Sequence, residues 1–225
     1  MQDIEFVKPE EIERKSFEII KEALEAQNIS VPLQYTFLPG EDPEPVKNMI
    51  YRCIHTTADL DYAGTLRFSK GSVSVLRELL RSGADIVTDT NMALAGINKK
   101  VLSRYGGRAC CFMADEEVAK AAAESGVTRA YAAMEKASGI YGAEDGKPVI
   151  FAVGNAPTAL ISLYEMYKEK RFTPDFLIGV PVGFVNVTAS KELIMKTDIP
   201  YIINEGNKGG SPVASAIVNA VLYSL

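Results

Sequence analysis

The sequence predicts an α/β protein in three layers, α/β/α, in which helices cover both faces of a mainly parallel sheet. Two observations lead to this prediction. Short apolar runs, each long enough for one buried strand, alternate along the chain with longer segments that place apolar residues at helical spacing. Turns that contain glycine follow several of these runs, and the order strand, turn, helix is typical of right-handed crossovers between parallel strands.

The N-terminal part of the chain is predicted to contain one helix and one strand. Residues 9–27 begin with one Pro and two Glu and carry apolar residues at helical spacing, which predicts an amphipathic helix. Residues 31–46 are rich in proline and are interpreted as a connector. The apolar run at residues 49–54 is interpreted as the end of a strand, and residues 59–72 as a polar, turn-like segment.

From residue 73 onward, strands and helices are expected to alternate. The predicted strands are short apolar runs at residues 84–88, 108–113, 147–153, 175–182 and 199–204. The predicted helices cover residues 73–82, 116–126, 130–137, 160–170, 190–196 and 212–225. Gly83 and Gly126 are expected to end two of these helices, and Asp115 is expected to cap one.

The composition, with 47% hydrophobic and 24% charged residues, is that of a globular protein, and no linker divides residues 1–225, so we expect one domain. No stretch approaches the roughly 18 apolar residues that a membrane helix needs, and residues 1–15 hold no apolar signal core. We therefore expect a cytoplasmic protein without a membrane partner. The net charge of −5 disfavours nucleic acid as a partner, because neutralising phosphates requires a basic face.

Three cysteines and one histidine do not supply the ligands of a typical zinc or iron site. Cys53 stands alone, and Cys110 and Cys111 are adjacent, so the chain has neither a CxxC pair nor a disulfide framework. We expect no metal held by the protein itself.

His55, the only histidine of the chain, is the first candidate for acid–base chemistry. An unperturbed imidazole titrates at about 6.5 and so exchanges protons near neutral pH. Hydroxyl and carboxyl groups in residues 56–59 could orient it. The alternative is a half-buried histidine at a strand end without a catalytic role. Ser16 and Arg129 also have plain alternatives, as a solvated helical serine and a surface arginine.

The unusual loops follow predicted strands, so we expect them to meet at the C-terminal edge of the sheet, where open α/β sheets gather ligands. They cover residues 55–59, 89–92, 154–158, 179–186 and 206–211. Pro157 suits the first turn of a helix, whose free N–H groups would form an anion site. Lys208 with Gly209 and Gly210 would form a cationic nest, although the glycines could instead only supply a turn with positive φ.

A series of motifs in this order resembles the precorrin-8X methylmutase family, whose members are also called cobalt-precorrin-8 methylmutases or precorrin isomerases. The motifs are IERKSFEII at 12–20, RCIH at 52–55, DTNMALAGI at 89–97, GVTRA at 126–130, GNAPTAL at 154–160, IGVPVGFVN at 178–186, ASKE at 189–192 and GNKGGSPVASAIVNA at 206–220. The chain departs from the family in the longer connector at residues 31–46 and in residues 56–58, where members vary.

The resemblance implies a flavodoxin-like fold and a homodimer with sites near the subunit interface. It implies an isomerase of corrin (cobalamin) biosynthesis that moves a methyl group between adjacent ring carbons of precorrin-8X or cobalt-precorrin-8, giving hydrogenobyrinate or cobyrinate, with no added cofactor. Any cobalt would arrive inside the substrate. His55 would be the proton donor and acceptor, and Ser16 and Arg52 match substrate-contacting positions. Together with the loop residues, the candidate substrate-binding residues are Ser16, Arg52, Asp89, Arg129, Asn155, Thr158, Lys191, Lys208, Gly209 and Gly210.

Two other functions stay open on the sequence. A corrinoid-binding carrier protein would use the same pocket without chemistry. A phosphosugar or nucleotide enzyme on this scaffold would rest only on the glycine turns.

Overall fold

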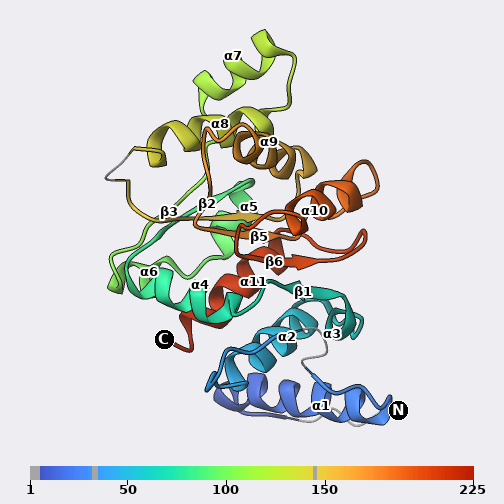
Figure 1. Ribbon diagram of the computed structural model, residues 1–225. Coiled ribbons are helices and arrows are strands. Elements are labelled where there is room, and N and C mark those ends of the chain that lie inside the picture. Colours follow the sequence, from blue (N-terminus) through green and yellow to red (C-terminus); the bar gives the residue numbers. More distant parts are fainter. Residues whose placement is uncertain (1–5, 32–34, 144–145) are drawn as a thin grey trace.

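The structure is a computed structural model that describes residues 6–31, 35–143 and 146–225 (Figure 1). Within these residues it contains one six-stranded sheet with the order β1-β6-β5-β4-β2-β3. The strands are β1 (Leu66–Phe68), β2 (Asp85–Thr88), β3 (Ala109–Cys110), β4 (Val149–Val153), β5 (Phe176–Gly179) and β6 (Tyr201–Asn204). All neighbouring strands are parallel except β1, which pairs antiparallel with β6.

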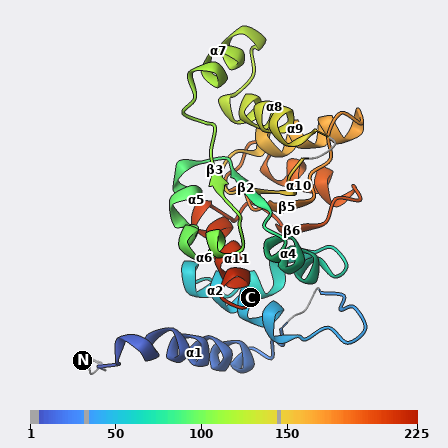
Figure 2. The ribbon, with the colours of Figure 1, turned by 90° about the vertical axis from the view of Figure 1, so that its left-hand side faces the viewer.

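Helices cover both faces of the sheet (Figures 1 and 2). One face carries α7 (Glu116–Ser125), α8 (Arg129–Tyr141), α9 (Pro157–Lys168) and α10 (Val187–Met195). The other face carries α2 (Glu44–Thr57), α4 (Ser72–Arg81), α5 (Asn91–Gly96), α6 (Lys99–Arg104) and α11 (Ser211–Leu222). The 3-10 turn Pro9–Glu11 leads into α1 (Ile12–Ala26), which packs on α2 as the outermost helix, and α3 (Tyr62–Thr65) precedes β1.

The strand residues divide the core into two hydrophobic clusters, one on each face. In β4, Ile150 and Ala152 belong to the cluster under α2, α4 and α11, whereas Phe151 and Val153 belong to the cluster under α8 and α9. This alternation is the two-residue period of a strand that is buried on both faces. Burying a side chain such as Phe151 contributes about 1.5–3 kcal/mol, so the central strands anchor the fold.

The parallel strands β3-β2-β4-β5-β6 have the order of the flavodoxin-like doubly wound sheets, 2-1-3-4-5. The predicted fold class is therefore confirmed. In such a sheet the strand order reverses between the first and third strands, here β2 and β4, and ligands commonly bind at the carboxyl ends of these two strands.

The predicted strand at residues 49–54 is wrong, because these residues form part of α2. Met49, Ile50, Cys53 and Ile54 are buried, while the intervening Tyr51 and Arg52 are partly exposed. This spacing is that of a helix face, which a run of six residues was too short to reveal.

Other local predictions were incomplete. Residues 59–72 contain α3 and β1, and residues 91–104 contain α5 and α6, none of which was predicted from the sequence. The predicted strand at 108–113 is reduced to the two residues of β3. In the connector at 31–46, residues 32–34 lie outside the described residues, and its last part begins α2. No helix in the described ranges is both long and apolar enough to cross a membrane.

Candidate functional site

Asp89 lies at the switch point of the sheet, directly after β2, and its side chain is fully buried. Its Oδ1 accepts a hydrogen bond from the backbone N–H of Gly154 (2.9 Å), and its Oδ2 accepts from Asn155 (2.8 Å) and Ala156 (2.6 Å). Burial raises the pKa of Asp89, and the three donors oppose this rise by stabilising the carboxylate.

The anion site was expected at the free N–H groups in the first turn of α9, which begins at Pro157, and this expectation stays a prediction, because the donors to Asp89 lie before the helix. The carboxylate of Asp89 instead holds the loop 154–156 in place without reaching solvent. This contact joins the end of β2 to the loop after β4. The sequence could not reveal it, because Asp89 and Gly154 are 65 positions apart.

An open groove of about 560 Å³ lies beside this loop, and we call it the sheet-edge groove. Its lining includes the N-terminal residues of α8 and α9 and the segment before α10, namely Thr128, Arg129, Asn155, Thr158 and residues 182–187. Thr128 caps α8 by accepting from the N–H of Tyr131 (3.2 Å), and its Oγ1 lies 2.7 Å from that of Thr158. The fold thus brings together three predicted residues, Arg129, Asn155 and Thr158.

The rim of the sheet-edge groove is apolar on one side. Val182, Phe184 and Val185 are 45%, 89% and 78% exposed, which is unusual for large apolar side chains. Arg129, which also lines the groove, is an exposed cation in the first turn of α8. The groove therefore combines a surface that can contact an apolar ring with a guanidinium that can bind a carboxylate.

His55 lies in the last turn of α2, and its side chain is exposed, so the half-buried histidine at a strand end is wrong. Its Nδ1 lies 2.6 Å from the Oγ of Ser16 on α1, and the tautomer decides which atom donates. The edge of the imidazole also contacts Phe17, with the ring centroids 6.1 Å apart. Ser16 and His55, which were predicted separately, therefore lie together where α1 packs on α2.

Arg52 lies one turn before His55 and is fixed from three sides. It donates to the Oε1 of Glu13 at 2.6 Å, and its guanidinium lies 5.7 Å from the ring centroid of Phe17 and 5.0 Å from that of Tyr223. We call Ser16, Arg52 and His55 the histidine cluster. Glu13 was not among the residues predicted from the sequence, although it lies three residues before Ser16, one helical turn away.

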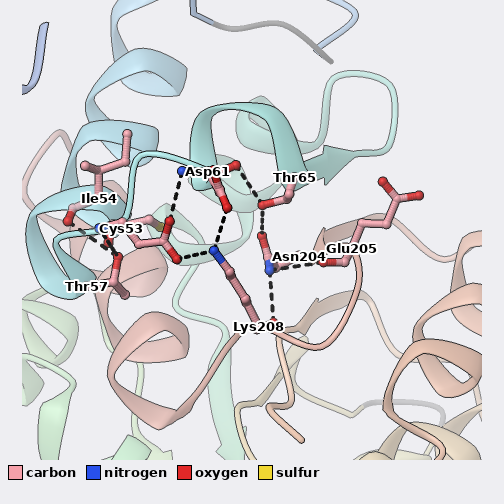
Figure 3. Close-up of polar contacts among 9 residues, drawn as sticks. Cys53, Ile54, Thr57, Asp61, Thr65, Asn204, Glu205 and Lys208 are labelled. Carbon is pink, nitrogen blue, oxygen red and sulfur yellow. Dashed lines mark hydrogen bonds and ion pairs between the residues drawn. The ribbon is translucent and has the colours of Figure 1, made fainter. Parts of the chain in front are cut away.

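The loop after β6 carries Lys208, which Figure 3 shows, and contacts Lys191 of α10. The Lys208 Nζ donates to the Oδ2 atoms of Asp59 and Asp61, each at 2.6 Å. Lys191 is 1% exposed and donates to the backbone oxygens of Gly206 (2.7 Å) and Lys208 (2.9 Å). Burial lowers the pKa of Lys191 to about 8. In the structure both amines are bound to oxygens of the chain itself, and the expected cationic nest of Lys208 with the glycines stays a prediction.

Gly209 and Gly210 allow this loop to approach β5. The N–H of Gly210 donates to the carbonyl of Val180 at 2.8 Å, and a Cβ on Gly209, at φ +157°, would lie 2.1 Å from the same oxygen. These glycines supply positive φ and a close backbone contact, which is the alternative that the sequence left open beside an anion nest. In the same loop, Asn207 accepts from Gly183 N (3.1 Å) and Thr188 Oγ1 (3.0 Å). The loop therefore joins the groove rim to the residues that follow His55.

In the described part of the chain, no three His, Cys, Asp or Glu side chains are grouped so that they could hold a metal ion.

Residues 11–224 match the precorrin-8X methylmutase family. The chain belongs to this family. It is 41% identical over 221 residues to the cobalt-precorrin-8 methylmutase of Salmonella typhimurium, with 96% of each protein covered. It is 34% identical over 181 residues to the precorrin-8X methylmutase of Pseudomonas aeruginosa, and this match covers 80% of this chain and 84% of that protein.

A solved precorrin-8X methylmutase from Thermus thermophilus has a similar structure. It matches with a TM-score of 0.75 and 32% identity, over 95% of this chain and 96% of that one. The family predicted from the motifs is thereby confirmed, and with it the enzyme class, an isomerase of the methylmutase type in cobalamin biosynthesis.

Proposed function

We propose that this chain moves a methyl group between adjacent ring carbons of precorrin-8X or cobalt-precorrin-8, with His55 as the proton donor and acceptor and with no added cofactor. The products would be hydrogenobyrinate or cobyrinate, and any cobalt would enter within the substrate. The observation that carries the proposal is the 2.6 Å contact between the Nδ1 of His55 and the Oγ of Ser16. Among the described residues Ser16 is the hydrogen-bond partner of this imidazole, so Nε2 is left for a substrate.

A proton from His55 would make the conjugated macrocycle a better electron sink. The methyl group could then leave one saturated carbon and bond to its neighbour, formally a one-five sigmatropic shift, and the imidazole would take the proton back. The reaction is an isomerisation, so no atom is gained or lost. A positioned general acid of this kind typically contributes about 10² to 10⁴ in rate.

The substrate carries many carboxylates, and we assign two arginines to bind them. Arg129 is exposed at the sheet-edge groove, and Arg52 belongs to the histidine cluster. Phe184 and Val185 on the groove rim offer an apolar surface for the ring. An acidic protein can hold a polyanion in this way, because only the binding surface needs to be positive.

The proposal includes a homodimer in the cytoplasm with its sites near the subunit interface. Ile12 and Ile19 of α1 are 52% and 56% exposed, and Phe184 is 89% exposed, so apolar surface is available on α1 and on the groove rim. Exposed apolar surface of this kind is typical of protein contacts and ligand grooves. Sedimentation of the purified protein at several concentrations tests the dimer.

The function is tested by mixing the purified protein with metal-free and cobalt-bearing precursors and following their absorption spectra. The intact protein should shift the absorption to the red as conjugation extends through the formerly saturated carbon. His55→Ala should bind the tetrapyrrole and leave the spectrum unchanged with time. Thr56→Ala, which alters an exposed side chain of the same helical turn, is the matched control and should convert normally.

The same experiment separates the enzyme from a corrinoid carrier. A carrier would bind the precursors without converting them, and His55→Ala would then differ from the intact protein in affinity alone. The phosphosugar or nucleotide enzyme rests only on the glycine turns, and phosphate compounds that fail to compete with a corrinoid would exclude it. The N–H donors at one turn bind Asp89, and the glycines of the other pack against Val180.

A further inference from the structure

Lys208 lies between two carboxylates that follow the helix of His55. Its Nζ is 2.6 Å from the Oδ2 of Asp59 and 2.6 Å from the Oδ2 of Asp61 (Figure 3). We call these three residues the lysine clamp. The ammonium holds the pKa of Asp59 below its usual value, so Asp59 and Lys208 both stay charged at neutral pH.

The backbone of Lys208 is fixed independently of its side chain. Its carbonyl accepts from the buried amine of Lys191 at 2.9 Å and from the Nδ2 of Asn204, also at 2.9 Å. Asn204 in turn accepts from the hydroxyl of Thr65 at 2.7 Å. The clamp is thus anchored on the end of β6, a strand inside the sheet.

The carboxylate end of the clamp is joined tightly to α2. Ala58 ends the helix in a left-handed conformation with φ 53°, and its N–H donates to the carbonyl of Ile54 at 2.7 Å. The hydroxyl of Thr57 donates to Cys53 O at 2.8 Å and accepts from the N–H of Asp59 at 3.3 Å. His55 lies in this last turn, so a displacement of Asp59 would move the imidazole.

A direct role for Lys208 in binding a substrate carboxylate fits this geometry less well. Two carboxylates around one ammonium leave a local charge of −1, which repels an anion. Moreover, two of the three N–H donors of the amine are already engaged. The position of Lys208 therefore suits a group that acts on the protein rather than on the ligand.

We infer that Lys208, held by Asp59 and Asp61, is a positioning residue that fixes the end of α2 and thereby orients the imidazole of His55. This inference rests on the proposed role of His55. The clamp ties the His55 helix to the same loop that contacts the groove rim through Asn207, so it sets the imidazole relative to the bound macrocycle.

The test uses Lys208→Met, with Lys208→Arg as the variant that keeps the charge. Arg67→Met is the matched control, because Arg67 forms an ion pair with Glu205 of the same loop without contacting Asp59 or Asp61. Each full-length protein is assayed for kcat and KM with the tetrapyrrole precursor. Each is also examined by nitrogen-15 NMR of the imidazole, which gives one set of signals because the chain has one histidine.

For Lys208→Met we expect kcat to fall about tenfold to a hundredfold with little change in KM, as small misplacements of a reacting group do. We expect its imidazole shifts to move toward those of a histidine in an unstructured peptide, because the contact with Ser16 loosens. Lys208→Arg should recover most of both properties, and Arg67→Met should retain them. If Lys208→Met does not fold, Asp59→Asn combined with Asp61→Asn takes its place.

Unchanged imidazole shifts and an unchanged kcat in Lys208→Met would overturn the inference. A raised KM with unchanged kcat would also overturn it, because Lys208 would then bind substrate. If the intact protein converts neither precursor, the proposed function fails, but the imidazole shifts still decide whether the clamp orients His55.

Discussion

Ser16 and His55 are 39 positions apart and come from different helices, yet the Oγ of one lies 2.6 Å from the Nδ1 of the other. The contact exists because α1 packs along α2, its main neighbour in the structure. The docking of one outer helix therefore fixes the ring orientation of the only histidine in the chain. A histidine whose Nδ1 is held in this way presents its Nε2 in a defined direction.

Ser16→Ala should lower kcat about fivefold with little change in KM. Removing one hydrogen bond that orients a side chain costs about 1 kcal/mol, which corresponds to about that factor in rate. Steady-state conversion of the tetrapyrrole measures the effect. Ser82→Ala, at an exposed serine on the end of α4, is the control and should leave both constants unchanged. An unaltered kcat in Ser16→Ala would show that the serine does not orient the imidazole.

Asp89→Asn should lower the free energy of unfolding by about 3 kcal/mol. An amide has one acceptor oxygen and would turn its own N–H groups toward at least one backbone donor, leaving it unpaired in a buried site. Urea unfolding followed by circular dichroism measures the change. Asp198→Asn, at an exposed aspartate, should change stability by less than about 0.5 kcal/mol. Equal stability of the two variants would contradict the role assigned to Asp89.

Gly209→Ala should destabilise the protein more than Gly206→Ala. Both glycines have positive φ, but the new Cβ at Gly209 would lie 2.1 Å from the Val180 carbonyl, whereas nothing lies within 4 Å of a Cβ at Gly206. Gly206→Ala should lower the free energy of unfolding by about 1–2 kcal/mol through backbone strain alone. Gly209→Ala should lower it further, because β5 or the loop must also move to make room for the new Cβ. Thermal unfolding of the two variants ranks them, and the reverse order would refute the close contact.

The lysine clamp should stabilise the protein over a broad range of pH. The pKa of Asp59 is lowered from 3.8, so its contribution is present above that value and is lost as the pH falls below it. The pKa of Lys208 is raised above 10.5, so its contribution is present below 10.5 and is lost as the pH rises through the raised value.

The stability difference between the intact protein and Asp59→Asn should therefore be constant from about pH 5 to about pH 9 and shrink below about pH 3.8. Because Lys208 is 47% exposed and Asp59 is 28% exposed, solvent weakens the pair, and the difference should be small. Urea titrations at a series of pH values measure it. If the stability difference does not shrink in acid, the substitution changes stability through something other than the charge of Asp59.

The central strands could be predicted from the sequence because their signal is local. In β4 and β2 every residue is buried, and a continuous run of Val, Ile and Phe between turns is typical of a strand that is covered on both faces. The prediction failed in the N-terminal part. The run from Met49 to Ile54 spans less than two helical turns, which is too short to show a helical period. β1 was not predicted, because its three residues form a strand only through their pairing with β6.

The parts of the candidate site whose chemistry depends on the type of a residue could be predicted from the sequence. The parts that depend on contacts between distant segments could not. His55, Ser16 and Arg52, named from their residue types and motifs, lie together where α1 packs on α2, and Arg129, Asn155 and Thr158 line one groove. By contrast, the carboxylates that bind the loops after β4 and β6, Asp89 at one loop and Asp59 with Asp61 at the other, make contacts between distant segments. Distant pairings of this kind leave no periodicity in the sequence.

A single turnover shows whether the imidazole of His55 supplies the proton for methyl migration. Excess His55→Ala protein is mixed with the tetrapyrrole precursor, and binding and the red shift of the absorption are recorded in the same sample. We predict binding close to that of the intact protein, with a red shift at least about a hundredfold slower. A red shift at the rate of the intact protein would contradict this prediction.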